Sequence, residues 1–535
     1  MQGEREVKSE SAIESMPALN GNDFHENVPS QQKQQLERYI NFFSSIAFST
    51  CLLATWESAG GSLLSGLYNG GPAAIVYGII LSTVGNLAIA CSLAELASLH
   101  PTAGAQYQWC YFLAPRGRRF ISFIQGKRIS FYSSSLTCIF LLKISGWVTV
   151  FSWSALVCIA PYFIGTQIQG MVVLAHPDYE LVRWRGTLLM WAVAIIPIII
   201  NVFARRVLAG IEVAAGIMHV VFLPITIIVF VALAPPNPDS FVWNTFVGGL
   251  SGWENSGVVF SIGLLGVITP LAGVDGIIHM AEEVKNAKVV VPRSMIYGTL
   301  INGVLAFSYL IATLYCMGDY TEAVTSPTGY PIITIAYQAT GSKAATFVLM
   351  TMGMLPGWIA LFNGLASVTR LTWAFARDNG LPFSEFFAVV DPTYKIPLRA
   401  LFLVASCIFA LSFIQIGSTA AFNAILSLST LGLYISYLVP LTLLVLKRLT
   451  SPQDIPQGAF SLGKLGLPMN LLAILFATYF SIFLPFPATL PVTGENMNYA
   501  GPVLGFVILF ACGDWIVRGR HKWEGPGMKS DANGQ

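Results

Sequence analysis

The chain has 535 residues, 54% of them hydrophobic and only 10% charged, with a formal net charge of +2 and a mean hydropathy of +0.65. Soluble domains carry about 25% charged residues, so this composition excludes a soluble globular protein. The chain has neither a basic domain nor a basic stripe, which argues against a nucleic-acid partner. We therefore expect an all-α, multi-pass membrane protein.

In chain order, a polar tail at residues 1–37 comes first and lacks the apolar core of a signal peptide. Twelve apolar segments follow within residues 38–520, each long enough for one transmembrane helix. Residues 521–535 form a second polar tail. The approximate cores of the segments are Ile40–Tyr68, Ala73–Ser98, Trp147–Leu174, Gly186–Phe203, Ile211–Leu233, Ser256–Met280, Ser294–Met317, Ala344–Ala374, Ala400–Ile416, Ala420–Leu446, Pro468–Leu484 and Ala500–Ile516.

Basic residues predict the orientation in the membrane. They follow the even-numbered segments, whereas the intervening loops contain fewer of them. Because basic loops stay in the cytosol, we expect both termini to be cytosolic. The residues that carry this signal are Arg116, Arg118, Arg119, Arg205, Arg206, Lys285, Lys288, Arg293, Arg377, Lys395, Arg399, Lys447, Arg448, Lys464, Arg518, Arg520 and Lys522.

Two segments are interrupted near their middles by small residues and one carboxylate. The first reads CLLATWESAGG from Cys51 to Gly61, and the second reads GVITPLAGVDG from Gly266 to Gly276. An ionisable group in hydrocarbon costs about 2.5–3.5 kcal/mol on insertion scales. Unwound backbone at membrane depth is tolerated only where it lines a cavity. Two such interruptions in equivalent halves of the chain are typical of the binding site of a secondary transporter.

The two carboxylates are the main candidates for binding chemistry. Glu57 is expected to face a cationic substrate or a coupling proton; the alternative is a structural carboxylate bound to unwound backbone. Trp56 would either cover a quaternary ammonium group by cation–π attraction or simply pack. Asp275 would hold substrate, take part in proton coupling, or cap the helix that follows Gly273.

Other motifs narrow the class of protein. His279, Glu282 and Glu283 end the sixth segment, and we expect the glutamates to be solvated or to pair near Lys285 and Arg293. The chain has no Walker loop, nucleophile elbow or dinucleotide fingerprint, and its His and Cys residues lack metal-ligand spacing. We therefore expect no enzyme activity, no cofactor and no metal. Transport energy would come from an ion gradient or from the substrate gradient.

Four stretches together resemble one family of transporters. They are GLYNGGP (Gly66–Pro72), ELASLHPTAGAQYQW (Glu95–Trp109), HMAEEVKN (His279–Asn286) with Val291-Pro292-Arg293, and TRLTWAFARDNGLP (Thr369–Pro382). As a set they resemble the fungal amino acid/choline transporter family of the amino acid–polyamine–organocation superfamily, which includes choline and GABA permeases. The resemblance covers about residues 38–520.

The resemblance implies a LeuT-like core of two inverted five-helix repeats, with two discontinuous helices and two peripheral helices. Substrate would lie between segments one, three, six and eight. Thr269 stands where related amino-acid transporters often place a gating aromatic, and Trp56-Glu57 looks more like the choline-type members. The substrate-binding residues that the resemblance implies are Trp56, Glu57, Ser58, Ala59, Gly60, Gly61, Thr269, Pro270, Leu271, Gly273 and Asp275.

We therefore expect a plasma-membrane transporter that imports a small amine such as choline by proton symport. The first alternative is a GABA or neutral amino-acid permease, whose substrate carboxylate would rest on the helix N-termini at Gly60 and Gly273. A nutrient sensor with a permease fold is a second alternative, but such sensors would be expected to carry longer cytosolic tails. The expected partners are the amine or amino-acid substrate, protons and the lipid bilayer, without nucleic acid.

One segment does not fit the helix pattern. Lys127–Ser145 interrupts the third segment, which would otherwise begin near Phe120. Joining its flanks gives RRFISFIQG followed by WVTVFSW, an uninterrupted helix entry, and its two ends can be encoded by splice-site sequences. We hypothesise that the segment is a retained intron. The alternative is a real loop or helical insertion, whose three basic residues would be costly in or beside a spanning helix.

Sequencing of mature transcripts is expected to find a message without the codons for residues 127–145. The reading frame should continue across the junction, because the segment is a whole number of codons. Retention of these codons in the mature message would refute the intron.

Overall fold

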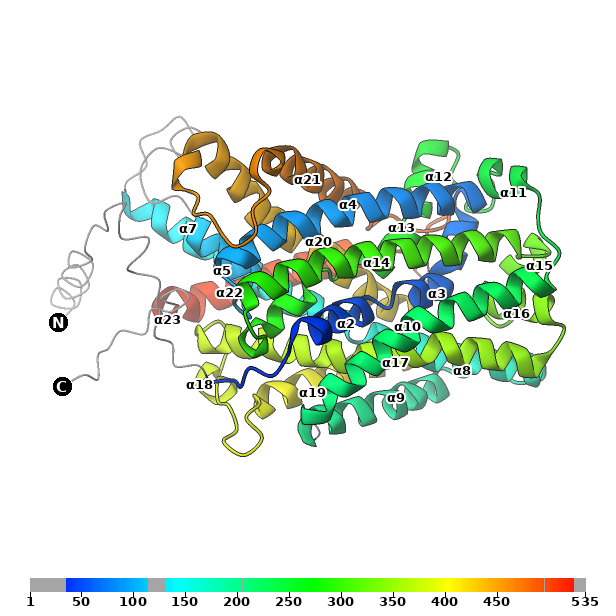
Figure 1. The fold of residues 1–535 in the computed structure, drawn as a ribbon, viewed down its shortest axis with the longest axis horizontal. Coiled ribbons are helices and arrows are strands. Elements are labelled where there is room, and N and C mark those ends of the chain that lie inside the picture. The colour runs from blue at the N-terminus through cyan, green and yellow to red at the C-terminus, as the bar shows by residue number, and fades with distance from the viewer. Residues whose placement is uncertain (1–34, 114–130, 204, 495, 524–535) are drawn as a thin grey trace.

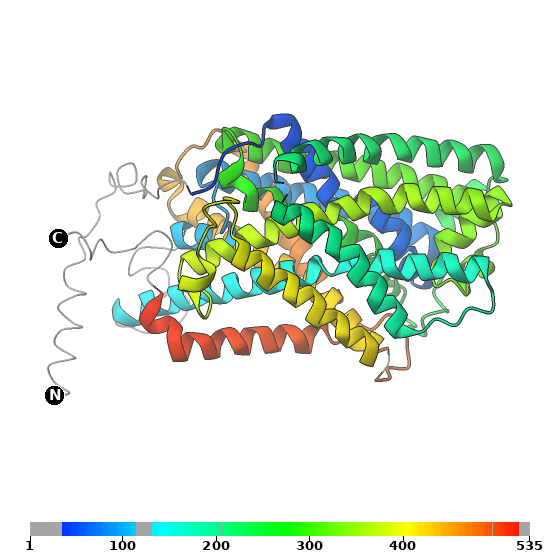
Figure 2. The same cartoon turned by 90° about the horizontal axis from the view of Figure 1, so that it is seen from below.

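A computed structural model describes residues 35–113, 131–203, 205–494 and 496–523 as a bundle of helices along one long axis (Figures 1 and 2). Within these residues there is no strand, only an isolated β-bridge between Ile40 and Val284. The short helices α5 (Gln106–Leu113), α18 (Ser384–Phe387) and α23 (Arg520–Lys522) lie at one end of the bundle. At the other end lie α11 (Asp239–Asn244), α15 (Tyr320–Val324) and α16 (Pro331–Thr340).

Eleven helical segments in the described residues are long and apolar enough to cross a membrane, which agrees with a multi-pass membrane protein. They correspond to the second to twelfth segments of the sequence analysis. The helices in them are α4 (Gly71–Leu99), α7 and α8 (Phe131–Leu156, Ile159–Ala175), α9 (Arg183–Phe203), α10 (Arg205–Leu233), α12, α13, η2 and η3 (Ser256–Gly263, Leu265–Ile268, Thr269–Leu271, Gly276–Glu283), α14 (Ala287–Tyr315), α17 (Lys343–Arg377), α19 (Leu398–Gly417), α20 (Thr419–Thr450), η5 and α21 (Gly463–Leu465, Gly466–Phe483), and α22 with η6 (Ala500–Asp514, Trp515–Gly519); the short turn η4 (Pro452–Asp454) follows α20.

The first predicted segment is divided into two short helices, α2 (Phe42–Leu53) and α3 (Thr55–Tyr68), of 12 and 14 residues. The division is at Ala54, whose φ of 40° and ψ of 50° are left-handed and end the hydrogen-bond ladder of α2. The interruption predicted within Cys51–Gly61 is thus present, but the expectation of exposed backbone at Gly60 and Gly61 was wrong, because both glycines lie inside α3. They admit close neighbours instead: a β-carbon at Gly60 would lie 2.8 Å from the Tyr309 hydroxyl.

The second predicted break is confirmed. Helical structure stops after Leu271, the backbone of Ala272 is extended, and a 3₁₀ helix, η3, begins at Gly276. Gly273 has a φ of +95°, which glycine adopts without steric penalty and other residues rarely do. The two breaks lie side by side, since the Thr55 hydroxyl donates to the Pro270 carbonyl at 3.3 Å.

Part of the suspected intron lies outside the described residues. From Phe131 onward the segment is helical and continues into α7 without interruption. The third predicted segment therefore begins before Trp147, and it is divided near Val157 and Cys158 between α7 and α8. The retained intron itself stays a prediction, because a helix does not reveal whether its codons are spliced out.

The fold depends on close contact between α12 and the end of α3. A β-carbon at Gly263 would overlap the backbone carbonyl of Asn69, which cannot move as a flexible side chain would. We expect Gly263→Ala to lower the stability of the protein by about 1–3 kcal/mol, as overpacking does. Thermal melting in detergent measures this as a lower melting temperature. Gly505→Ala in α22 is the matched control, since no atom lies within 4 Å of the added carbon; equal melting of the two variants would contradict the prediction.

Candidate functional site

A cavity of about 120 Å³ lies between α2–α3, α7–α8, the break after η2, and α17. These are the first, third, sixth and eighth segments, between which the family resemblance places substrate. Four of the implied site residues line the cavity: Glu57, Ser58, Thr269 and Pro270. The other implied residues do not line it; these are Trp56, Ala59, Gly60, Gly61, Leu271, Gly273 and Asp275.

Small residues make up most of the wall that α17 contributes. Gly353, Gly357, Ala360 and Gly364 line the cavity along this helix, together with the larger Met354 and Leu361. A β-carbon at Gly357 would lie 3.9 Å from that of Glu57, so α17 passes close to α3 at this point. Small residues thus let two helices approach closely and still leave space for a small molecule.

Glu57 is paired, and its partner is a histidine from a distant part of the chain. The Nδ1 atom of His219, on α10, lies 2.7 Å from Oε1 of Glu57, and the His219 side chain is fully buried. The second carboxylate oxygen, Oε2, has no hydrogen-bond partner among the described residues. The carboxylate therefore has one oxygen fixed by α10 and one oxygen left for another group.

Trp56 packs against α10 and α14 and does not line the cavity. Its indole N–H donates to the backbone carbonyl of His219 at 3.1 Å, and its ring centroid lies 5.3 Å from that of Tyr309. These contacts hold the start of α3 against α10 and so support the Glu57–His219 pair. The aromatic side chains that do line the cavity are Trp153 and Phe163.

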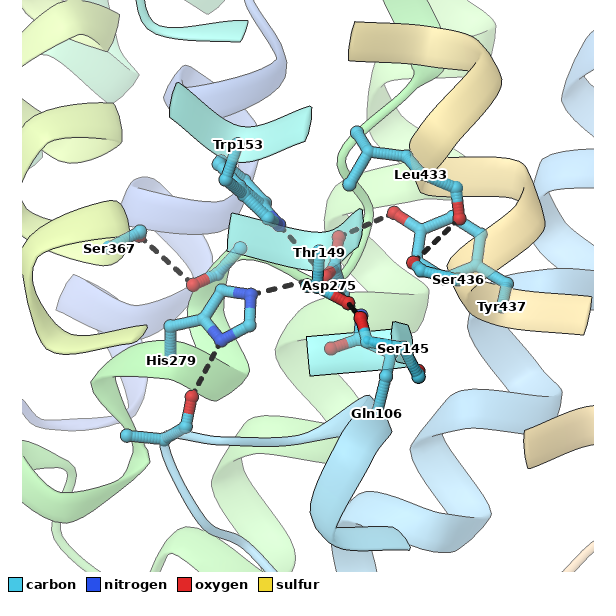
Figure 3. A network of polar contacts seen from close by, with 12 residues as sticks. Gln106, Ser145, Thr149, Trp153, Asp275, His279, Ser367, Leu433, Ser436 and Tyr437 are labelled. Atoms are coloured by element: carbon cyan, nitrogen blue, oxygen red, sulfur yellow. Dashed lines mark hydrogen bonds and ion pairs between the residues drawn. The ribbon is translucent and has the colours of Figure 1, made fainter. Parts of the chain in front are cut away.

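Asp275 is the centre of a buried polar network below the cavity (Figure 3). Its Oδ1 accepts from the Tyr437 hydroxyl at 2.5 Å, and its Oδ2 accepts from Gln106 Nε2 at 2.5 Å and from Trp153 Nε1 at 3.1 Å. His279 Nε2 lies 3.2 Å from the same Oδ2. The expectation of a helix cap was wrong, because the Asp275 side chain makes no capping hydrogen bond and is turned into the bundle.

The His279 imidazole lies between a backbone carbonyl and the Asp275 carboxylate. Its Nδ1 lies 2.8 Å from the Ala103 carbonyl, which can only accept, so Nδ1 carries a hydrogen. Its Nε2 faces Oδ2 of Asp275, which also accepts from Gln106 and Trp153. The Asp275 carboxylate is thus in contact with groups from α5, α7, α20 and η3.

The two glutamates at the end of η3 are paired, but not with the residues that the sequence analysis named. Glu283 is fully buried and accepts from Arg370 Nε at 2.8 Å. Glu282 accepts from Arg377 at 3.0 Å. Both arginines are on α17, so the fold and not the nearby sequence supplies the partners of η3.

The sequence analysis missed two functional candidates, His219 and Arg370. Each is an ionisable residue inside an apolar segment. The same criterion had been used to select Glu57 and Asp275, but it was not extended to these two residues. The pairs themselves could not be found from one sequence, since 162 residues separate Glu57 from His219. The signal for His219 is that it stands alone as a polar residue in an apolar part of its segment.

Comparisons with known proteins agree with this architecture. A family profile described as amino acid permease matches residues 40–509. A Macrophomina phaseolina protein assigned by name to amino acid/polyamine transport is 29% identical over 456 residues, which are 85% of this chain and 96% of that protein. The choline transporter of Saccharomyces cerevisiae is 28% identical over 519 residues, 95% of this chain and 86% of the relative. Amino-acid permease 2 of Neurospora crassa is 27% identical over 493 residues, 92% and 86% of the two chains.

The network predicts a structural role for Asp275. Asp275→Asn should lower stability by about 1–3 kcal/mol, because the amide N–H₂ faces groups that are themselves donors and leaves them unsatisfied. Melting in detergent measures the loss. Asp454→Asn, on an exposed turn, is the control and should melt like the wild type. An Asp275→Asn protein that melts normally but no longer couples transport to protons would instead support the coupling role.

Proposed function

The chain belongs to the amino acid permease family, and from this we propose that it is a secondary active transporter that imports a small organic cation such as choline. Its relatives are named transporters and permeases, not enzymes. Membership of the family supports an amino acid or amine as substrate. The choice of a cation rests on the cavity.

One observation carries the proposal: Glu57 is the only ionisable side chain among the described residues that line the cavity. Without a Lys or Arg in its wall, the cavity has no fixed positive charge for a substrate carboxylate. Trp153 and Phe163 add aromatic surface, which attracts quaternary ammonium groups by cation–π interaction. The remaining wall is mainly apolar and suits the methyl groups of such a cation.

We propose that Oε2 of Glu57 meets the cationic head. His219 holds Oε1, and this fixes the carboxylate in one orientation before substrate arrives. Ser58, Thr269 and Pro270 would complete the contact from the two breaks, and Ser62 and Gln167 are further polar groups in the wall. The residues behind the wall, Trp56 and Asp275 among them, would keep the breaks in place.

The wider arrangement is part of the same proposal. We infer twelve spans, counting α2–α3 as the first, arranged as two inverted five-helix repeats with two peripheral helices. Both termini would be cytosolic in the plasma membrane, since the basic loops lie on that side. Because the chain has no nucleotide-binding motif, import would be driven by an ion gradient or by the substrate gradient, and of these we propose proton symport.

A second candidate substrate is a neutral amino acid or GABA. The name of one relative favours it, since it refers to amino acids alone, whereas another relative is named for both amino acids and polyamines. The substrate amine would meet Glu57, and its carboxylate would approach the N-terminus of α3. In this structure that N-terminus is at Thr55 and not at Gly60, so the carboxylate would lie one to two turns nearer the start of the segment than expected from the sequence.

Uptake of labelled choline separates the two substrates. We expect saturable uptake in cells that lack their own choline carrier, unaffected by unlabelled GABA or amino acids. Glu57→Gln should weaken choline binding by about 30-fold or more, the usual loss when one partner of a buried charge pair is removed. Uptake of a zwitterion should fall as well, because its amine would also meet Glu57, so the competition by GABA and amino acids is what separates the two substrates.

Two controls accompany this experiment. Glu180→Gln removes an exposed carboxylate from a loop and should transport like the wild type. The full chain and a form without Lys127–Gly146 are compared, so that the suspected intron cannot hide activity. If the protein reaches the cell surface but takes up GABA or amino acids and no choline, the cation proposal is wrong.

A further inference from the structure

A buried carboxylate that the cavity does not use lies on α10. Glu212 is completely buried, and neither of its carboxylate oxygens has a hydrogen-bond partner within the part of the chain that the structure describes. It lies seven residues before His219, about two turns along the same buried face of the helix. Glu212 is thus displaced from Glu57 toward the end of the bundle where η3 terminates.

Three other segments bring titratable groups to Glu212. Arg370 of α17 and Glu283 of η3 act on it electrostatically, and these two side chains are bonded to each other at 2.8 Å. Cys51 of α2 lies within the electrostatic reach of both Glu212 and Glu57. The α2 helix is pressed against α10 between the two carboxylates, since a β-carbon at Gly216 would lie 3.1 Å from that of Ala47.

In the observed arrangement the charged form of Glu212 is expensive. A buried anion without a single hydrogen-bond donor loses its hydration, and this loss outweighs the attraction of Arg370, so the neutral acid is the favoured form. Arg370 compensates only in part, because its Nε donates to Glu283. Glu212 therefore holds a proton while η3 is in place.

We propose that Glu212 carries the co-transported proton and that Arg370 releases it by exchanging partners. The inference rests on the proposed function as a proton-coupled importer. Opening toward the cytosol requires η3 to move, which takes Glu283 away from Arg370. The freed guanidinium then stabilises Glu212 as an anion, and the Glu212 proton passes to cytosolic water.

The charges balance over one cycle. In the closed state Glu283 and Arg370 form an ion pair and Glu212 is neutral. In the open state Arg370 pairs with Glu212, Glu283 is solvated, and one proton has entered the cytosol with the substrate. Return of η3 restores the Glu283–Arg370 pair, and Glu212 takes its next proton from the outer side.

The test uses the full chain in proteoliposomes with the membrane potential held at zero. One pH unit corresponds to about a tenfold concentration ratio, so the wild type should accumulate labelled choline about tenfold across a one-unit gradient. Glu212→Gln, which mimics the neutral acid permanently, should still exchange labelled for unlabelled choline, although more slowly. Its accumulation should fall to a ratio of about 1, and substrate-dependent proton entry should disappear.

Two further variants make the comparison independent of folding. Glu212→Asp keeps a titratable group and should restore accumulation, whereas Glu212→Asn should not. This pair makes the same comparison if the Gln variant does not reach the membrane. Glu254→Gln, at an exposed loop position, is the control for a lost carboxylate and should accumulate like the wild type.

The outcomes separate this inference from the proposed function. A wild type that takes up an amino acid and no choline refutes the choline proposal, and the Glu212 comparison is then made with that amino acid. A Glu212→Gln protein that accumulates substrate with proton entry like the wild type refutes the proton site. Loss of coupling in His219→Gln, with Glu212→Gln fully coupled, would move the site to His219.

Discussion

The cost of an unpaired charge in a low-dielectric interior is the constraint on which this structure depends. Glu57, Asp275 and Glu283 are each placed where water is largely excluded, and each is bonded to a group from a different helix or loop. Breaking such a pair is expensive, because the remaining charge is left without compensation. The pairs therefore fix which helices are neighbours: α3 with α10, η3 with α5, α7 and α20, and η3 again with α17.

Two of these contacts are on η3, which follows directly after the second break. A 3₁₀ helix has poorer hydrogen-bond geometry than an α-helix and is rarely long, so η3 contributes little stability of its own. Polar side chains hold it at both ends, Asp275 at its start and Glu283 at its finish. The segment just before α2 adds a third attachment, since Tyr39 and Ile40 donate backbone N–H groups to the Glu283 carbonyl. A segment that is weak internally but tied by exchangeable polar contacts is suited to move as a unit.

The sequence was sufficient to predict the helical membrane class, the positions of eleven spans and the second break. It was sufficient because length, apolarity, and the Gly-Pro pattern around Gly273 are local properties. Within the first break, the exposed backbone was misplaced by six residues, since Ala54 carries no local signal for a left-handed backbone, whereas Gly60 and Gly61 do. The glycine at position 60 is explained instead by the close contact of Tyr309, which is a tertiary contact that the local sequence does not show. The charge partners were out of reach for the same reason: His219 and Arg370 are brought to Glu57 and Glu283 only by the packing of α10 and α17.

The separation of Glu57 from Glu212 also has an electrostatic logic. A proton carried on His219 would create an imidazolium 2.7 Å from the Glu57 carboxylate, and this charge would compete with a cationic substrate for the same anion. A proton carried on Glu212 changes the local charge by the same one unit, but it does so farther from the substrate. At about 10 Å and an effective dielectric constant near 20, even a full charge would act on the substrate with less than about 2 kcal/mol. In the proposed coupling, substrate and proton therefore use different carboxylates, and Glu212 of α10 is the second one.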